Sequence, residues 1–99
     1  EAIEQYQKAL EINPDLFRAH NSLAILLARR GDFSGAIEHY QQAITFYPGF
    51  AKAHNNLGSA LAAQGRFEEA MTHFEKALNI DPNYIDARKN LELARSLVR

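Results

Sequence analysis

The chain has 99 residues, enough for one domain of ordinary size. Its hydrophobic fraction of 46% and charged fraction of 23% are those of a soluble globular protein, and no apolar run approaches the roughly 18 residues that a membrane-spanning helix needs. The net charge of -1 argues against a nucleic-acid partner, because nucleic-acid-binding surfaces are usually strongly basic. The absence of cysteine excludes disulfides, thiol nucleophiles and thiolate metal sites, and it leaves the compartment open, with the cytoplasm favoured.

A 34-residue period runs through the sequence. The three prolines, Pro14, Pro48 and Pro82, are 34 residues apart, and each closes a segment of the same pattern: AIEQYQKALEINP, AIEHYQQAITFYP and AMTHFEKALNIDP. Residues 17–50 and 51–84 are identical at twelve of 34 positions. A fixed period of this length is typical of proteins built from stacked helical repeats.

Residues 1–14 are expected to form the second helix of a repeat whose first helix is missing. Their apolar residues recur at helical spacing, and Pro14 ends the helix because the residue before a proline is pushed out of the helical region. We expect at least one more helix upstream in the parent protein. Without it, part of the apolar stripe should stay exposed and mediate self-association. The candidate residues for this oligomerisation are Ile3, Tyr6 and Leu10.

Residues 15–48 are expected to form a full repeat of two antiparallel helices. Gly31 should end the first helix with left-handed backbone, which glycine adopts without a side-chain penalty. Asp15 and Asp32 stand where helix caps are wanted, and Pro48 ends the second helix.

Residues 49–82 repeat this pattern, with Gly65 in the turn between the helices and Pro82 at the end. The second helices share one aromatic position that we expect in the core, occupied by Tyr6, Tyr40 and Phe74.

Residues 83–99 are expected to form one more first helix, with Asn83 as its cap. Here Glu92 and Arg95 replace a small and a large apolar residue of the full repeats. We therefore expect a solvent-facing helix that caps the array, since repeat proteins need polar ends. The whole chain is predicted to be a single all-α domain of about six helices.

The order of large and small residues resembles the tetratricopeptide repeat, and the resemblance covers essentially the whole chain. Histidine stands where that family most often has tryptophan or tyrosine. The resemblance implies a right-handed α-solenoid of antiparallel helix pairs. It is carried by His20, Leu23, Ala24, Leu27, Ala36, Tyr40 and Pro48, and again by His54, Leu57, Gly58, Leu61, Ala70, Phe74 and Pro82.

The same resemblance implies that the first helices line a concave groove that binds a protein or peptide. Most of the inward positions are polar, amide-rich and mildly basic. The inward positions also include Ala28, Ala62, Ala63 and Leu93. The candidate binding residues are Arg18, Asn21, Ser22, Ile25 and Arg29; Lys52, Asn55, Asn56 and Ser59; and Asp86, Lys89 and Asn90.

Asn56 and Asn90 share one groove position, and an asparagine amide can both donate to and accept from the backbone of an extended peptide. This resembles the asparagine ladder in the superhelix of O-linked N-acetylglucosamine transferases, which implies peptide capture that tolerates many sequences. Ser22 breaks the ladder. The alternative is that Asn55 and Asn56 are only solvated polar residues.

A second family precedent is a carboxylate clamp that grips an acidic C-terminal tail. Arg18, Lys52 and Asn56 offer part of such a clamp, whereas Asp86 stands where a further basic residue would help. We keep the clamp as an alternative interpretation of the groove.

The four histidines are expected to be structural. His20 and His54 repeat at a packing position and should be partly buried between helices, while His39 and His73 should lie on the outer flank. A zinc site needs three or four ligands, and no spacing in the sequence supplies them. We expect no metal and no cofactor.

The sequence therefore predicts a protein-interaction module without catalytic activity of its own. It has no glycine-rich phosphate loop, and no motif pairs a nucleophile with an activating base. Two alternatives stay open: an assembly element that oligomerises through the N-terminal helix, and a substrate-recruiting part of a larger enzyme.

Overall fold

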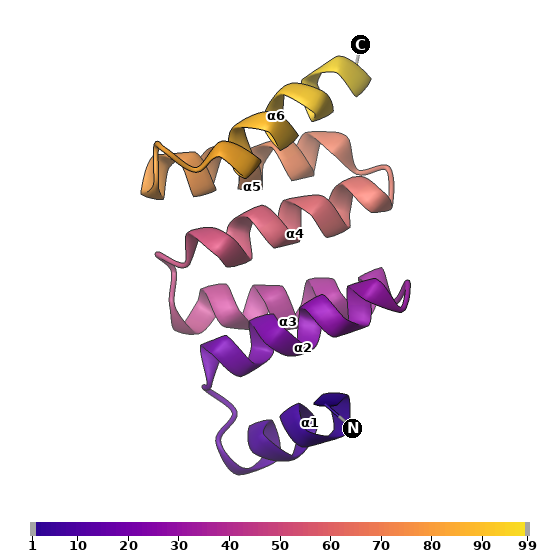
Figure 1. Cartoon of the computed structure of the whole chain (residues 1–99), viewed down its shortest axis with the longest axis vertical. Helices are drawn as coiled ribbons and strands as arrows, with labels where there is room; N and C mark the ends of the chain where they lie inside the picture. The colour runs from indigo at the N-terminus through magenta and orange to yellow at the C-terminus, as the bar shows by residue number, and fades with distance from the viewer. Residues whose placement is uncertain (1, 99) are drawn as a thin grey trace.

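The computed structural model describes residues 2–98, which form six helices joined by turns (Figure 1). They stack side by side along the long axis of a body of 43 × 26 × 18 Å. The helices are α1 (Ala2–Ile12), α2 (Phe17–Arg29), α3 (Phe33–Phe46), α4 (Ala51–Ala63), α5 (Phe67–Ile80) and α6 (Ile85–Leu97).

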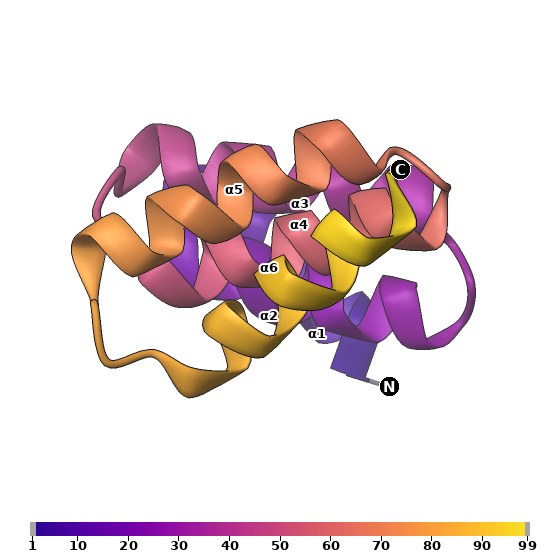
Figure 2. The same ribbon diagram turned by 90° about the horizontal axis from the view of Figure 1, so that it is seen from above.

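Each helix packs on the next one in the chain, and α4 also contacts α2 and α6. Seen from above, α3 and α5 lie along one side of the molecule and α2 and α6 along the opposite side (Figure 2). The chain is thus an all-α solenoid of antiparallel helix pairs, as the sequence predicts. None of the described helices has the length and apolar character needed to cross a membrane.

The turns inside the two full repeats depend on glycine. Gly31 and Gly65 have φ values of 84° and 79°, which confirms the predicted left-handed backbone. In the first turn the N–H of Asp32 donates to the carbonyl of Leu27 at 2.9 Å, and in the second Arg66 donates to Leu61 at 2.9 Å. These bonds satisfy carbonyls that the end of a helix otherwise leaves without a partner.

The predicted caps are correct at one position and wrong at two. Asp32 caps α3, because its carboxylate accepts a hydrogen bond from the N–H of Gly35 at 3.0 Å. Asp15 and Asn83 are not caps: α2 follows Leu16 and α6 follows Tyr84, neither with a side-chain cap. After each proline the backbone first closes a turn, which delays the start of the helix.

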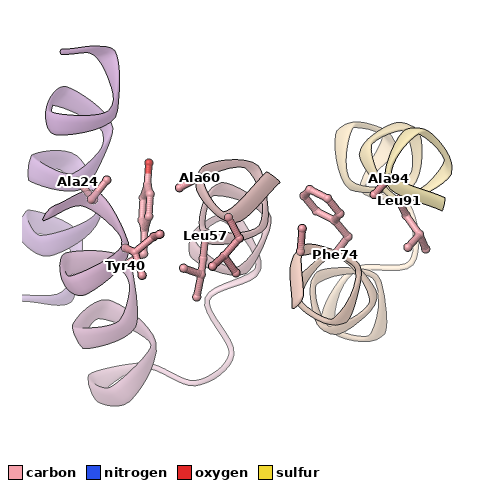
Figure 3. Packing of buried hydrophobic residues seen from close by; sticks show 11 residues of the cluster. Ala24, Tyr40, Leu57, Ala60, Phe74, Leu91 and Ala94 are labelled. Carbon is pink, nitrogen blue, oxygen red and sulfur yellow. The ribbon is translucent and has the colours of Figure 1, made fainter. Parts of the chain in front are cut away.

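The core is built around two aromatic rings, Tyr40 and Phe74, each held between successive first helices (Figure 3). Phe74 lies between α4 and α6, and a Cβ atom at Gly58 of α4 would stand 2.5 Å from its ring. Small residues therefore allow the helices to approach closely. Tyr40 and Phe74 are buried as predicted, whereas Tyr6 is half-buried.

The apolar stripe of α1 is less exposed than the sequence suggests. Ile3 and Leu10, expected on an uncovered surface, are only 8% and 9% exposed because they pack against Leu23 of α2. The next helix in the chain, α2, covers this part of the stripe. Ile3 and Leu10 are therefore buried within the chain, contrary to the expected exposure.

Glu92 and Arg95 of α6 are exposed, and Arg95 lies 3.8 Å from Glu75 of α5. The same helix also leaves Leu93 and Leu97 61% and 52% exposed, so it is less polar than its two charges suggest.

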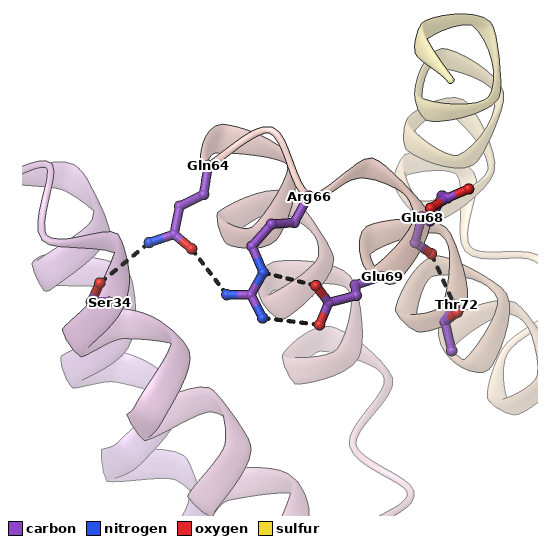
Figure 4. A network of polar contacts seen from close by, with 6 residues as sticks. All are labelled: Ser34, Gln64, Arg66, Glu68, Glu69 and Thr72. Atoms are coloured by element: carbon purple, nitrogen blue, oxygen red, sulfur yellow. Dashed lines mark hydrogen bonds and ion pairs between the residues drawn. The ribbon is translucent and has the colours of Figure 1, made fainter. Parts of the chain in front are cut away.

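A chain of surface side chains joins α3 to the turn between α4 and α5 (Figure 4). Gln64 donates to the hydroxyl of Ser34 at 3.3 Å and accepts from Arg66 at 3.1 Å. Arg66 also donates two hydrogen bonds to Glu69, at 2.8 and 2.9 Å. The bond to Arg66 lowers the pKa of the Glu69 carboxyl. The network lies in water, so it orients the turn more than it stabilises the fold.

Candidate protein-binding face

The predicted binding residues lie on α2, α4 and α6, which are neighbours in space although helices intervene between them in the chain. We call the surface around Asn56 and Asn90 on these helices the amide face. The exposed members are Arg18, Arg29, Lys52, Ser59, Asp86 and Lys89, and the half-buried members are Ser22, Ile25, Asn56 and Asn90.

Asn21 and Asn55 differ from the other candidates because they are 7% and 6% exposed. They were predicted to face a partner, but their side chains are used inside the protein. Asn56 donates to the amide oxygen of Asn21 at 3.3 Å, and Asn90 donates to that of Asn55 at 3.0 Å. The fifth residue of α2 and of α4 is therefore structural, whereas the equivalent Lys89 of α6 is exposed.

These two amide bonds repeat one period apart and connect α2 to α4 and α4 to α6. Each contributes about 1 kcal/mol to stability. Each also fixes the orientation of a half-buried asparagine, Asn56 or Asn90, whose amide oxygen carries no hydrogen bond from the other described residues. A fixed amide with a vacant acceptor can bind a backbone N–H of another chain.

Asn55 is held from a second side. Its amide donates to the phenol oxygen of Tyr84 at 3.5 Å. Burial raises the pKa of Tyr84, and the bond from Asn55 lowers it. Tyr84 occupies the repeat position of Phe50 and Leu16, so the sequence period places it but does not reveal this bond.

Arg18 is positioned by aromatic residues that the sequence analysis did not single out. Its guanidinium carbon lies 5.3 Å from the centre of the Phe17 ring, a cation–π geometry. Phe17 in turn packs against Tyr47 and Phe50, with ring centres 4.9 and 5.5 Å away. The cluster combines α2 with the loop before α4, a contact that only the fold creates.

An apolar hollow ends the amide face at α6. It is a cavity of about 150 Å³ lined by apolar residues of three helices together with Ser59 and Asn90. Leu93, one of the inward positions predicted from the repeat, contributes to its wall, and Leu97 does as well. The apolar lining residues are Ala62, Phe67, Phe74, Leu93, Ala94 and Leu97.

The histidines form two matched pairs. His20 Nδ1 lies 3.0 Å from His39 Nδ1, and His54 Nδ1 lies 3.3 Å from His73 Nδ1. His20 and His54 are buried as expected, while His39 and His73 are half-buried against them rather than on an outer flank. Between residues 2 and 98, no three histidine, cysteine or acidic side chains are grouped to hold a metal ion.

Burial is the main cause of the pKa shifts in these pairs. It lowers the pKa of His39, which His20 lowers further, and it lowers the pKa of His54, which Lys76 lowers further. The pKa of His73 is lowered to about 4 by burial, then by His54 and Lys76. His39, His54 and His73 are therefore neutral at physiological pH.

Solved structures of similar shape support the fold. MamA is matched in two crystal structures, at 26% and 25% identity with TM-scores of 0.92 and 0.93. Thermobaculum terrenum O-GlcNAc transferase is matched at 32% identity over 93% of the chain, with a TM-score of 0.88. The first TPR domain of Spaghetti (RPAP3), bound to the HSP90 peptide SRMEEVD, is matched at 24% identity over 95% of the chain, with a TM-score of 0.93.

The chain spans only part of these proteins: 55% and 52% of the two MamA chains, 75% of the RPAP3 chain and 18% of the transferase. No curated protein matches its sequence significantly. The family model for the tetratricopeptide repeat matches residues 51–84, and a second model for TPR repeats matches residues 1–31 and 26–65. The chain therefore belongs to the tetratricopeptide repeat family.

Proposed function

We propose that the chain is a protein-interaction module that binds an extended peptide segment on the amide face. The observation that carries this proposal is the repeated amide bond, which holds Asn56 and Asn90 in the same orientation one repeat apart. An extended chain presents backbone N–H and C=O groups at regular intervals, and two fixed amides at a regular interval are suited to it.

Two proteins of similar structure are compatible with this function. O-GlcNAc transferase, whose superhelix the asparagine positions resemble, is 32% identical to the chain over the matched region. RPAP3, of the same fold, holds a peptide, so the fold is able to bind one. The chain itself is proposed to have no catalytic role.

The decisive variants are Asn56→Ala and Asn90→Ala together. A peptide selected from a displayed library against the wild-type chain would be labelled, and its affinity measured by fluorescence polarisation. We expect the double variant to bind about tenfold more weakly or worse, because two hydrogen bonds are lost.

The matched control is Asn13→Ala with Asn79→Ala, two exposed asparagines that lie outside α2, α4 and α6. This control should bind as the wild type does, and circular dichroism should show equal helix content in all three proteins. Equal affinity of the Asn56/Asn90 variant and the wild type would place the binding surface elsewhere.

The carboxylate clamp gives a second candidate, supported by the placement of Arg18 over Phe17 and by the exposure of Lys52 at the equivalent position of α4. Under the clamp, an acidic peptide should lose affinity steeply with salt and with Arg18→Ala. Under backbone capture through the amides, affinity should change little with salt. The salt dependence of the selected peptide therefore separates the two modes of binding.

A further inference from the structure

The two histidine pairs occupy the same place in both full repeats, between the first helix and the second. In each pair the rings are stacked, with centres 5.2 and 5.6 Å apart. The histidine of the first helix also bonds to the proline carbonyl that precedes it: His20 Nε2 to Pro14 at 2.6 Å, and His54 Nε2 to Pro48 at 3.1 Å. The pairs therefore connect three segments of the chain.

This arrangement fixes where protons can sit. A carbonyl only accepts, so Nε2 of His20 carries a proton, and in the neutral ring Nδ1 then has the free electron pair. His39 donates its Nδ1 proton to that electron pair. One added proton can bind to Nε2 of His39 without breaking the bond. A second added proton would place two N–H groups against each other at Nδ1 and break the contact.

The two pairs differ in the charged groups that surround them. Beside His20 and His39 stand three carboxylates: Glu11 of α1 lines the adjoining cavity, and Asp32 and Glu38 act on His39 electrostatically. These groups favour a proton on the first pair.

Beside His54 and His73 stands Lys76 of α5, which lines the corresponding cavity and lowers the pKa of both rings. Glu69, also of α5, acts in the opposite direction on His73 and raises its pKa. In the first repeat the position of Lys76 is occupied by the neutral Gln42, which lines the first cavity.

We propose that the histidine pairs are acid-sensitive joints between the two helices of each repeat, and that Lys76 makes the second repeat the one that acid loosens. At neutral pH both joints are closed. As the pH falls, the nearby carboxylates help the first joint to accept a proton in place, whereas burial and Lys76 oppose a proton on the second joint until α4 and α5 separate.

The direction follows from the proton balance. In the unfolded chain His73 has its ordinary pKa of 6.5, and in the folded chain its pKa is about 4. Between these values the unfolded state binds more protons, so the stabilisation is complete above pH 6.5 and is lost as the pH falls toward 4. For the half-buried His73 we expect the equilibrium constant for opening to rise about tenfold between pH 7 and pH 5.

Opening the second joint would also disturb the amide face. His54 is followed directly by Asn55, and His20 by Asn21, the two buried asparagines that hold the amide bonds. Movement of α4 at His54 therefore shifts Asn55 against Asn90. The device does not depend on which partner the amide face binds.

The test uses two exchanges at exposed positions, Lys76→Gln and Gln42→Lys, which leave the histidines in place. The pKa of each histidine would be measured by NMR titration of the ring C–H signals in the wild type and both variants. We expect the pKa of His73 to be lower than those of His39 and His54, Lys76→Gln to raise it, and Gln42→Lys to lower that of His39.

Hydrogen exchange provides the second readout. Comparing pH 7 with pH 5, after correction for the intrinsic exchange rate, we expect protection to fall more in α4 and α5 than in α2 and α3. Lys76→Gln should reduce that difference. A His73 pKa near 6.5, a His73 pKa insensitive to Lys76→Gln, or equal loss of protection in both repeats would overturn the proposal.

Discussion

Single side chains decide how closely the helices of this chain approach each other. The clearest example is Gly58, whose missing side chain leaves room for the ring of Phe74. Phe74 is itself fully buried, and it also lines the apolar hollow beside α6. The fit between a glycine on α4 and an aromatic residue on α5 thus determines how closely the two helices of the second repeat approach each other.

Gly58→Ala tests this fit. An added Cβ would stand 2.5 Å from Phe74 Cε1, and overpacking of a core costs about 1–3 kcal/mol. Alanine gains about 1 kcal/mol over glycine in a helix, so we expect a net loss of about 1 kcal/mol in the free energy of unfolding. Urea denaturation measures it. Gly49→Ala, whose Cβ would meet nothing closer than 3.5 Å, should stay within about 0.5 kcal/mol of the wild type. A Gly58→Ala protein as stable as the wild type would mean that Phe74 can move.

At the scale of helices, the sequence predicts the elements well and their first residues less well. The glycine turns and the proline stops follow from the backbone preferences of single residues, so they can be predicted locally. The start of a helix depends on how the preceding turn closes. Tyr84 donates its N–H to Asp81 at 3.1 Å, and Asp81 accepts from Asn83 at 3.1 Å, so Asn83 belongs to the turn instead of capping the helix.

Asp32→Ala should therefore destabilise the chain by about 1 kcal/mol, because the N–H of Gly35 loses its acceptor at the first turn of α3. Asp15→Ala is the matched control, since Asp15 forms no cap, and it should change the free energy of unfolding by less than about 0.5 kcal/mol. Thermal and urea unfolding of the two variants compare these losses. Equal losses of stability in the two variants would mean that the carboxylate of Asp32 contributes no more as a helix cap than that of Asp15.

At the scale of the whole molecule, packing runs from each helix to its neighbours, so the stability of the chain is close to a sum of neighbour terms. The repeat period predicts this architecture and identifies which helices share a face. It does not distinguish Asn55 from Asn56, because both are polar residues on one helix side. Only the approach of α4 to α6 shows that Asn55 is buried and that Asn90 donates to it.

The same limit applies to the aromatic cluster of Phe17, Tyr47 and Phe50 and to the histidine pairs. Phe17 is 30 residues from Tyr47 and 33 from Phe50, and the two histidines of each pair are 19 residues apart, so these contacts exist only in the folded protein. The period assigns each residue a position in the repeat but does not show which residues touch. Ile3 and Leu10 illustrate the converse, since the sequence pattern suggests an exposed stripe whereas contact with α2 buries both residues.

We propose that a partner binds on the amide face of α2, α4 and α6. The most direct test is to titrate a library-selected peptide into isotope-labelled chain and to map the NMR shift changes. We expect the largest changes at the backbone of Ser22, Asn56 and Asn90 and at the side-chain amides of the two asparagines, with small changes along α3 and α5. Shift changes concentrated on α3 and α5 would contradict the claim.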